Sequence, residues 1–76
     1  MKNTIRIQRA IKEITQEQLA EALGVARITI NAVELKKYAP SALLAMRMAR
    51  FFNVTMEELF ILEESDLNFK EIKEKE

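Results

Sequence analysis

The chain of 76 residues contains no cysteine and no histidine, and it has only one glycine and one proline. Without cysteine a disulfide framework is excluded, and a reducing compartment, by default the cytoplasm, is expected. The absence of histidine removes the commonest metal ligand and the commonest general base. Apolar runs are only a few residues long, so neither a membrane span nor a signal peptide is expected.

Chemistry-bearing patterns are also missing. No nucleophile–base pair, metal-ligand cluster or glycine-rich phosphate loop is visible, so we expect neither an enzyme nor a cofactor or small-molecule ligand. Seventy-six residues make a single domain. A domain of this size lies near the limit at which one hydrophobic core suffices, so a partner subunit would add stability.

The charges are unevenly distributed although the formal net charge is zero. Residues 1–50 carry nine Lys/Arg and four Asp/Glu, whereas residues 51–76 carry three Lys and eight Asp/Glu. A neutral chain with this asymmetry can present a basic face to a polyanion. The alternative is a solvated surface followed by a charged tail.

The apolar spacing predicts an all-α domain over residues 1–64. Its five helices are expected at about 5–13, 16–23, 26–36, 42–52 and 56–60. A short β segment after the fifth helix is possible, and residues 2–4 could pair with it. The charged tail, 65–76, is expected to be a frayed helix or disordered. The core-facing positions predicted for the first helix are Ile7, Ala10, Ile11 and Ile14. Those predicted for the second helix are Leu19, Ala20 and Leu23, and those for the fourth are Leu44, Ala45, Met48, Ala49 and Phe52.

Individual residues mark the expected ends of the second, third, fourth and fifth helices. Thr15 and Gln18 match a capping box at the start of the second helix, and Gly24 suits its left-handed end. Ala26 should begin the third helix, although it has no side-chain oxygen with which to cap it. The other predicted caps are Ser41 and Asn53 around the fourth helix, and the capping box of Thr55 and Glu58.

The joint between the second and third helices has the demands of a helix-turn-helix. Ala20 provides a small residue at the helix crossing, and Gly24 provides the turn. Val25, Ile30 and Val33 can anchor the third helix to the core. This ordered set predicts two helices held at a short, sharp turn.

The stretch "TQEQLAEALGVARITINAVELKKYAPS" resembles the helix-turn-helix of the Xre family, small phage-repressor-like transcriptional regulators. The resemblance runs from about residue 4 to residue 63. The matching residues are Thr15-Gln16, Leu19-Ala20, Gly24-Val25, Arg27, Thr29-Ile30-Asn31, Glu34, Lys37-Tyr38 and Pro40-Ser41. The resemblance implies a five-helix fold and a homodimer bound to a palindromic DNA operator.

In such a protein the N-terminal half of the third helix enters the major groove. Arg27 can then bond guanine or clamp a phosphate, and Asn31 can read adenine or hold a phosphate. Thr29 can bond a phosphate or place its methyl against thymine. The predicted DNA-contacting residues are Gln16, Ala26, Arg27, Ile28, Thr29, Asn31, Lys36, Lys37 and Tyr38.

Phosphate contacts are expected at both ends of the motif. The backbone N–H of Gln16 lies near the positive end of the second helix, which suits a phosphate. Lys36, Lys37 and Tyr38 follow the third helix and would reach backbone oxygens, making binding salt-dependent. Glu34 is an acid in this region, and we expect it to pair within the fold, with Arg9, Lys12 or Arg47.

Three residues depart from the family pattern. Ala26 stands where Ser or Thr usually caps the helix, and Lys36 stands where Gly or Asn commonly ends it. Ile28 stands where Gln often reads a base, and it can offer only apolar contact, for instance to a thymine methyl, unless it is buried or at an interface. Either the operator differs or DNA binding is weakened.

Two classes of function therefore remain. The favoured one is a sequence-specific DNA-binding regulator, expected to be a homodimeric repressor that occludes its operator. An antitoxin or restriction-control protein would look the same. The rival is a protein-interaction module that keeps the fold without binding DNA. The residues predicted at the dimer interface, unless they complete the core, are Leu43, Phe51, Phe60, Ile61 and Leu62.

Overall fold

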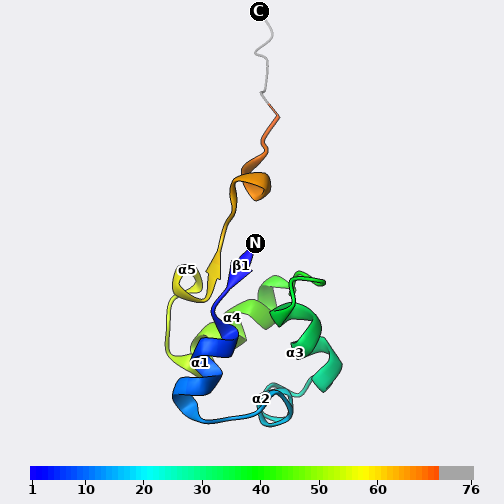
Figure 1. Cartoon of the computed structure of the whole chain (residues 1–76), viewed down its shortest axis with the longest axis vertical. Helices are drawn as coiled ribbons and strands as arrows, with labels where there is room; N and C mark the ends of the chain where they lie inside the picture. The colour runs from blue at the N-terminus through cyan, green and yellow to red at the C-terminus, as the bar shows by residue number, and fades with distance from the viewer. Residues whose placement is uncertain (71–76) are drawn as a thin grey trace, which may run out of the picture.

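The computed structural model describes residues 1–70, and within that range five helices surround one apolar core (Figure 1). The helices occupy the N-terminal four-fifths of the chain, and the segment after the last helix leads away from them. The elements in chain order are β1 (Lys2–Asn3), α1 (Ile5–Lys12), α2 (Gln16–Leu23), α3 (Arg27–Glu34), α4 (Ala42–Phe52), α5 (Met56–Leu59), β2 (Phe60–Ile61) and the 3-10 turn η1 (Glu64–Leu67).

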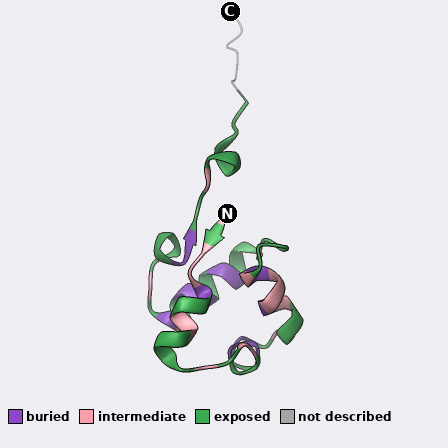
Figure 2. Cartoon of the chain, in the orientation of Figure 1, coloured by how far each residue is buried: buried purple, intermediate pink, exposed green. Residues whose placement is uncertain are grey.

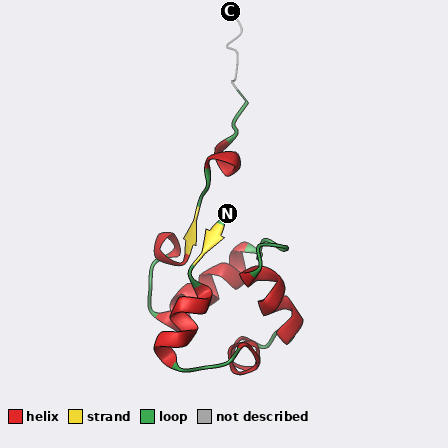
Figure 3. Ribbon diagram, in the orientation of Figure 1, coloured by secondary structure: helices red, strands yellow, loops and turns green. Residues whose placement is uncertain are grey.

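The two short strands join the beginning of the domain to its end (Figure 3). They pair antiparallel, with Lys2 opposite Ile61 and Asn3 opposite Phe60. Thr4 extends the connection, since its N–H donates to the Leu59 carbonyl at 2.9 Å. The extended segment predicted after the fifth helix is thus present, and its partner is the N-terminal segment of the same chain.

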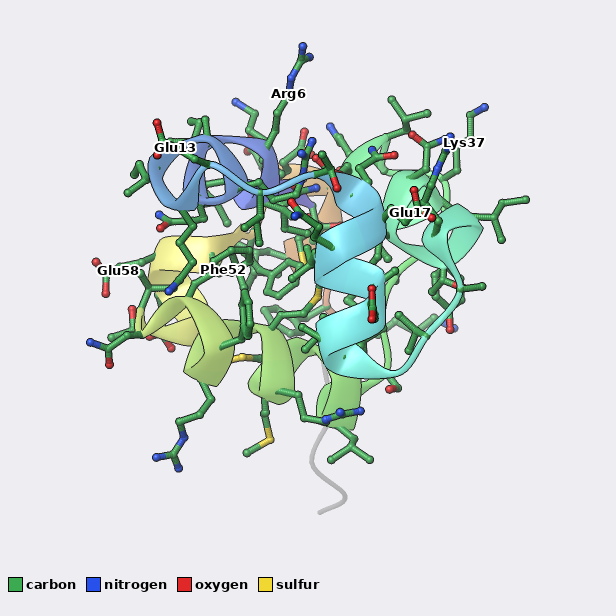
Figure 4. The ribbon with its side chains drawn as sticks, turned by 90° about the horizontal axis from the view of Figure 1, so that it is seen from below. Arg6, Glu13, Glu17, Lys37, Phe52 and Glu58 are labelled. Atoms are coloured by element: carbon green, nitrogen blue, oxygen red, sulfur yellow. The ribbon has the colours of Figure 1, made fainter. Side chains whose placement is uncertain are left out.

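The core is formed by one face of each helix, as the burial colouring indicates (Figure 2). α4 supplies the largest share, and Phe52 points inward between the helices (Figure 4). Its buried residues are Leu44, Ala45, Met48, Ala49 and Phe52, the five positions that the helical spacing predicts. α2 and α3 contribute the predicted inward residues Leu19, Ala20, Leu23, Ile30 and Val33.

The inward face predicted for α1 is wrong at Ile7, Ala10 and Ile11, which are exposed, whereas Ile14 packs against the core as predicted. Ile7 and Ile11 are 60% and 70% exposed, whereas Ile5 is fully buried. At roughly 100° per residue, Ile7 lies about 200° round the helix from Ile5. The face that meets the core also includes Arg9, whose guanidinium contacts a partly buried acid of α3. The apolar spacing alone does not reveal that ion pair, which lies on the same side of α1 as the buried Ile5.

Four helices end in the same way, although the sequence has one glycine. The left-handed residues are Glu13 (φ 56°), Gly24 (φ 70°), Lys36 (φ 64°) and Asn53 (φ 56°). At the end of α3, Lys36 N–H donates to the Val33 carbonyl at 3.0 Å and Lys37 N–H to the Ala32 carbonyl at 2.9 Å. These two hydrogen bonds together form a Schellman motif. It ends α3 at Glu34, two residues earlier than predicted.

The segment after β2 is partly ordered. Glu63 and Asp66 form a capping box around η1, where the sequence predicts a frayed helix or disorder. The rest of the predicted tail, residues 71–76, lies outside the described residues. Among residues 1–70, no helix has the length and apolar character needed to cross a membrane.

Candidate nucleic-acid interface

Both ends of α2, including the turn that leads to α3, are fixed by local interactions. Thr15 caps α2 by accepting from the Gln18 N–H at 3.0 Å, while Gln18 Oε1 accepts from the Thr15 N–H at 2.9 Å. Gly24 ends α2 with φ 70°, and a Cβ built there would meet no atom within 4 Å. The glycine is therefore required by its backbone angle and not by lack of space.

The beginning of α3 projects outward from this turn. Ala26 is its N-cap, in extended conformation and with no side-chain cap hydrogen bond. Arg27 and Ile28 follow as exposed residues, whereas Ile30 and Val33 are buried in the core. The N-terminal turn of α3 thus offers a cation and an apolar side chain to solvent, as the sequence predicts.

The acid of α3 is turned inward. Glu34 has a side chain that is 6% exposed, and its Oε1 lies 3.0 Å from Arg9 Nη2. Its Oε2 accepts from Gln16 Nε2 at 2.8 Å. The expected pairing of Glu34 within the fold is confirmed, with Arg9 as its partner. Its negative charge is neutralised away from the outer face of α3.

The same network joins the two helices of the motif. Gln16 Nε2 also donates to Asn31 Oδ1 at 3.1 Å, so α2 and α3 are connected by side chains as well as by packing. The sequence predicts only a role for the Gln16 backbone and misses this one. A signal was present, since Asn31 and Glu34 lie three residues apart and therefore share a helix face.

Arg27 and the start of α2 lie together. A surface hollow is lined by Arg9, Ile14, Thr15, Gln16, Glu17 and Arg27. Arg27 of α3 therefore lies beside the N-terminal end of α2, where backbone N–H groups and the helix dipole favour an anion. Two of the predicted contact residues, Gln16 and Arg27, therefore share one site.

Lys36 does not share that site. Its Nζ lies 2.7 Å from Glu63 Oε1, in the segment that follows β2. The Lys36 ammonium is the main cause of a lowered pKa at the Glu63 carboxyl, with the Met1 amino group, 3.0 Å away, as the second cause. Lys36 is therefore paired with an acid of its own chain, although its side chain is 47% exposed, and its contact with a DNA phosphate stays a prediction.

The remaining predicted contact residues lie around the outer face of α3. Lys37 and Tyr38 are exposed in the loop after the helix, and Thr29 and Asn31 are half-buried on it. Tyr38 lines a second hollow together with Ile28, Thr29 and Ala32. Gln16 and Arg27 thus line a polar hollow at the start of α2, and Ile28, Thr29 and Tyr38 line an apolar one along α3. Ala26, Asn31 and Lys37 line neither of these two hollows.

Comparison with known proteins assigns this arrangement to a family. The family model described as Helix-turn-helix matches residues 5–59, from the start of α1 to the end of α5. The chain belongs to this Xre-like helix-turn-helix family. The resemblance noted in the sequence is therefore confirmed, as is the mostly helical fold.

Relatives of this helix-turn-helix protein are found in archaea and bacteria. It is 48% identical over 66 residues to an uncharacterized HTH-type transcriptional regulator of Methanocaldococcus jannaschii, and that match covers 87% of this chain and 100% of the relative. It is 42% identical over 66 residues to the uncharacterized HTH-type transcriptional regulator YgzD of Bacillus subtilis, with the same coverage of both chains. A regulator of Archaeoglobus fulgidus with the same description is 46% identical over 67 residues, which are 88% of this chain and 96% of the relative.

The residues predicted at a dimer interface differ in how far they are exposed on this helix-turn-helix protein. Phe60 is buried in the core of its own chain, because the alternation of β2 turns Phe60 inward and Ile61 outward. Phe51 is half-buried against the core, with its ring edge-on to Phe52 at 5.2 Å between centroids. Leu43, Ile61 and Leu62 remain exposed. Phe60 therefore has little surface to offer to a partner.

Proposed function

We propose that this protein is a sequence-specific DNA-binding transcriptional regulator. The observation that supports this most strongly is the outward N-terminal turn of α3, where Arg27 stands beside the start of α2. In helix-turn-helix proteins that turn lies in the major groove, and the preceding helix meets the phosphate backbone. The names of the relatives, all HTH-type transcriptional regulators, agree with this function.

The electrostatics favour a polyanionic partner. Glu34 is the one acid between Ala26 and Tyr38, and it is held inward by Arg9 and Gln16. Arg27 and Lys37 are exposed on the outer side of the same stretch. Each phosphate that the protein neutralises should make binding weaker in salt, with a slope of roughly −0.9 in log K against log salt concentration.

Each predicted contact has a specific role in this proposal. Arg27 bonds guanine O6 and N7 or clamps a phosphate, and Thr29 bonds a phosphate. A phosphate sits at the N-terminal end of α2, near the Gln16 N–H. Asn31 already accepts from Gln16 through Oδ1, so its NH2 group is the part that donates to DNA. Lys37 and Tyr38 contact the sugar–phosphate backbone after α3.

A homodimer is the proposed functional unit. One helix-turn-helix reads only a few base pairs, whereas two copies related by a two-fold axis place their recognition helices in successive major grooves, roughly 34 Å apart. The operator is then palindromic. Leu43, Ile61 and Leu62, with the exposed part of Phe51, are the apolar residues proposed for the contact between the copies. Repression follows when the bound dimer covers promoter DNA.

The proposal is tested by binding to DNA selected from a random duplex library, measured by fluorescence anisotropy. Arg27→Ala should weaken binding by about 1–3 kcal/mol, or roughly 5- to 150-fold. The matched control is Arg50→Ala, which removes the same charge from an exposed position on α4. Equal losses in the two variants would remove Arg27 from the recognition surface.

A second candidate function is supported by Ile28, which is 76% exposed where a polar reader is usual in the family. A module that keeps the fold but binds another protein would have a use for such an apolar residue. It would show no affinity for mixed genomic DNA even at low salt, where non-specific binding to phosphates is strongest. Binding under those conditions favours the DNA-binding regulator.

A further inference from the structure

The outer face of α3 carries an apolar hollow that the fold itself does not need. Ile28 is 76% exposed and lies outside the core cluster. Its side chain therefore gains little of the stabilisation that complete burial of an isoleucine provides. The other lining residues are Thr29, Ala32 and Tyr38, so the hollow is built from aliphatic and aromatic groups with two hydroxyls.

The end of α3 shapes this hollow. Ile28 and Ala32 lie four residues apart and therefore share one side of the helix. The Schellman motif folds the chain back at Lys36, with Lys37 N–H bonded to the Ala32 carbonyl at 2.9 Å. The reversal brings Tyr38 beside Ala32, where it forms the far wall. The hollow is thus a product of the helix and the turn that ends it.

We infer that this hollow receives the 5-methyl group of a thymine in the major groove, and that Ile28 is the residue that selects it. The inference rests on the proposed function. Among the groups that base pairs present in the major groove, the thymine methyl is the apolar one. The side chains of Ile28, Ala32 and Tyr38 offer apolar contact on the helix that enters the groove.

Charge decides between DNA and a protein as the occupant. The hollow lies on a helix with exposed Arg27 near one end and exposed Lys37 after the other. The acid of that helix, Glu34, has a side chain that is 6% exposed and is paired with Arg9. Two cations flanking an apolar contact fit a methyl group carried between phosphates, whereas an apolar protein surface would leave both cations without partners.

The test compares thymine with uracil, which lacks only the methyl group. The protein is first used to select a duplex from a random library. Each thymine of that duplex is then replaced singly by deoxyuridine, and binding is measured by anisotropy. We expect at least one replacement per half-site to weaken binding of the wild type about fourfold, the effect of removing one buried methyl.

The variant Ile28→Ala should bind the thymine and uracil duplexes equally well. Its control is Ile11→Ala, which removes the same side chain from a 70% exposed position on α1 and should retain the wild-type discrimination. Both replacements lie on exposed helix surfaces, so thermal melting of the two variants should match and exclude unfolding as the cause.

Four results would overturn the inference. Tight binding without sensitivity to uracil at any position contradicts it and leaves the proposed function intact. Sensitivity that persists in Ile28→Ala assigns the methyl to another residue. Binding that ignores uracil but rises when cytosines of the duplex are methylated at C5 replaces thymine by 5-methylcytosine as the source of the methyl. Failure to bind any DNA at low salt rejects the proposed function itself, and Ile28 is then open to a protein partner.

Discussion

Replacing Glu34 by alanine should destabilise the domain by about 3 kcal/mol. The Glu34 side chain is 6% exposed, and its oxygens accept from Arg9 Nε, Arg9 Nη2 and Gln16 Nε2 at 3.3, 3.0 and 2.8 Å. Removing one partner of a buried ion pair typically costs about 3–5 kcal/mol. The lower end applies here because Arg9 is 16% exposed and keeps its bond to the Ile14 carbonyl.

Glu34→Gln separates the charge from the shape. The new amide can still accept from Arg9, but its NH2 group would face the NH2 group of Gln16. The two NH2 groups avoid each other only if the Gln16 side-chain amide rotates by half a turn. The hydrogen bond from Gln16 Nε2 to Asn31 Oδ1 is then lost. We expect a loss of about 1–2 kcal/mol, since a neutral acceptor is worth roughly half a charged one.

Both losses are measured by urea unfolding followed by circular dichroism. The control is Glu21→Ala, which removes an exposed acid of α2 and should change stability by no more than about 0.5 kcal/mol. A double-mutant cycle of Arg9→Ala with Glu34→Ala should give a coupling of at least about 1 kcal/mol. Additive effects, or a stability of Glu34→Ala equal to that of Glu21→Ala, would refute the reasoning.

Three further predictions concern helix ends. Glu13→Gly should raise the melting temperature by about 4–8 °C, because glycine adopts φ 56° without the strain that a glutamate has there. Asn53→Gly should change the melting temperature little, because asparagine already tolerates this backbone conformation. Ala26→Ser should stabilise the fold by about 0.5–2 kcal/mol by capping α3, and an unchanged melting curve would mean that the new hydroxyl finds no end N–H. In Lys36→Asn, the lowered pKa of Glu63 should rise in an NMR titration and yet stay below its ordinary value, because the Met1 amino group remains. The stabilisation that a lowered carboxyl pKa provides is present above the ordinary value of 4.5 and is lost as the pH falls through the lowered pKa, so the variant should also be less sensitive to acid. An unmoved titration would contradict the ion pair.

The local parts of the fold follow from the sequence because they depend on neighbouring residues. The capping box at Thr15 and the left-handed Gly24 need only a few positions on either side. The inward face of α4 repeats over three turns, so its periodicity has one interpretation. These signals are enough to place α2, α3 and the turn between them, which is the part of the fold that forms the candidate site.

The parts that the sequence does not reveal depend on contacts between distant segments. Ile7 and Ile11 have helical spacing, yet the side of α1 that meets the core carries Ile5 and Arg9, whose partner Glu34 lies on α3. Lys36 follows a recognition helix, and its ion pair is with Glu63, an acid far along the chain. Phe60 lies in an apolar run whose register becomes fixed only when β2 pairs with the N-terminal strand.

The central claim is that the N-terminal turn of α3 and the start of α2 meet DNA together. The most direct measurement is the change in backbone amide chemical shifts of the ¹⁵N-labelled protein as the selected duplex is added. We expect the largest changes at Gln16, Arg27 and Ile28, and small ones at Arg50 on α4. Shifts centred on α4 or on the segment after β2, with Arg27 and Gln16 unmoved, would contradict the account.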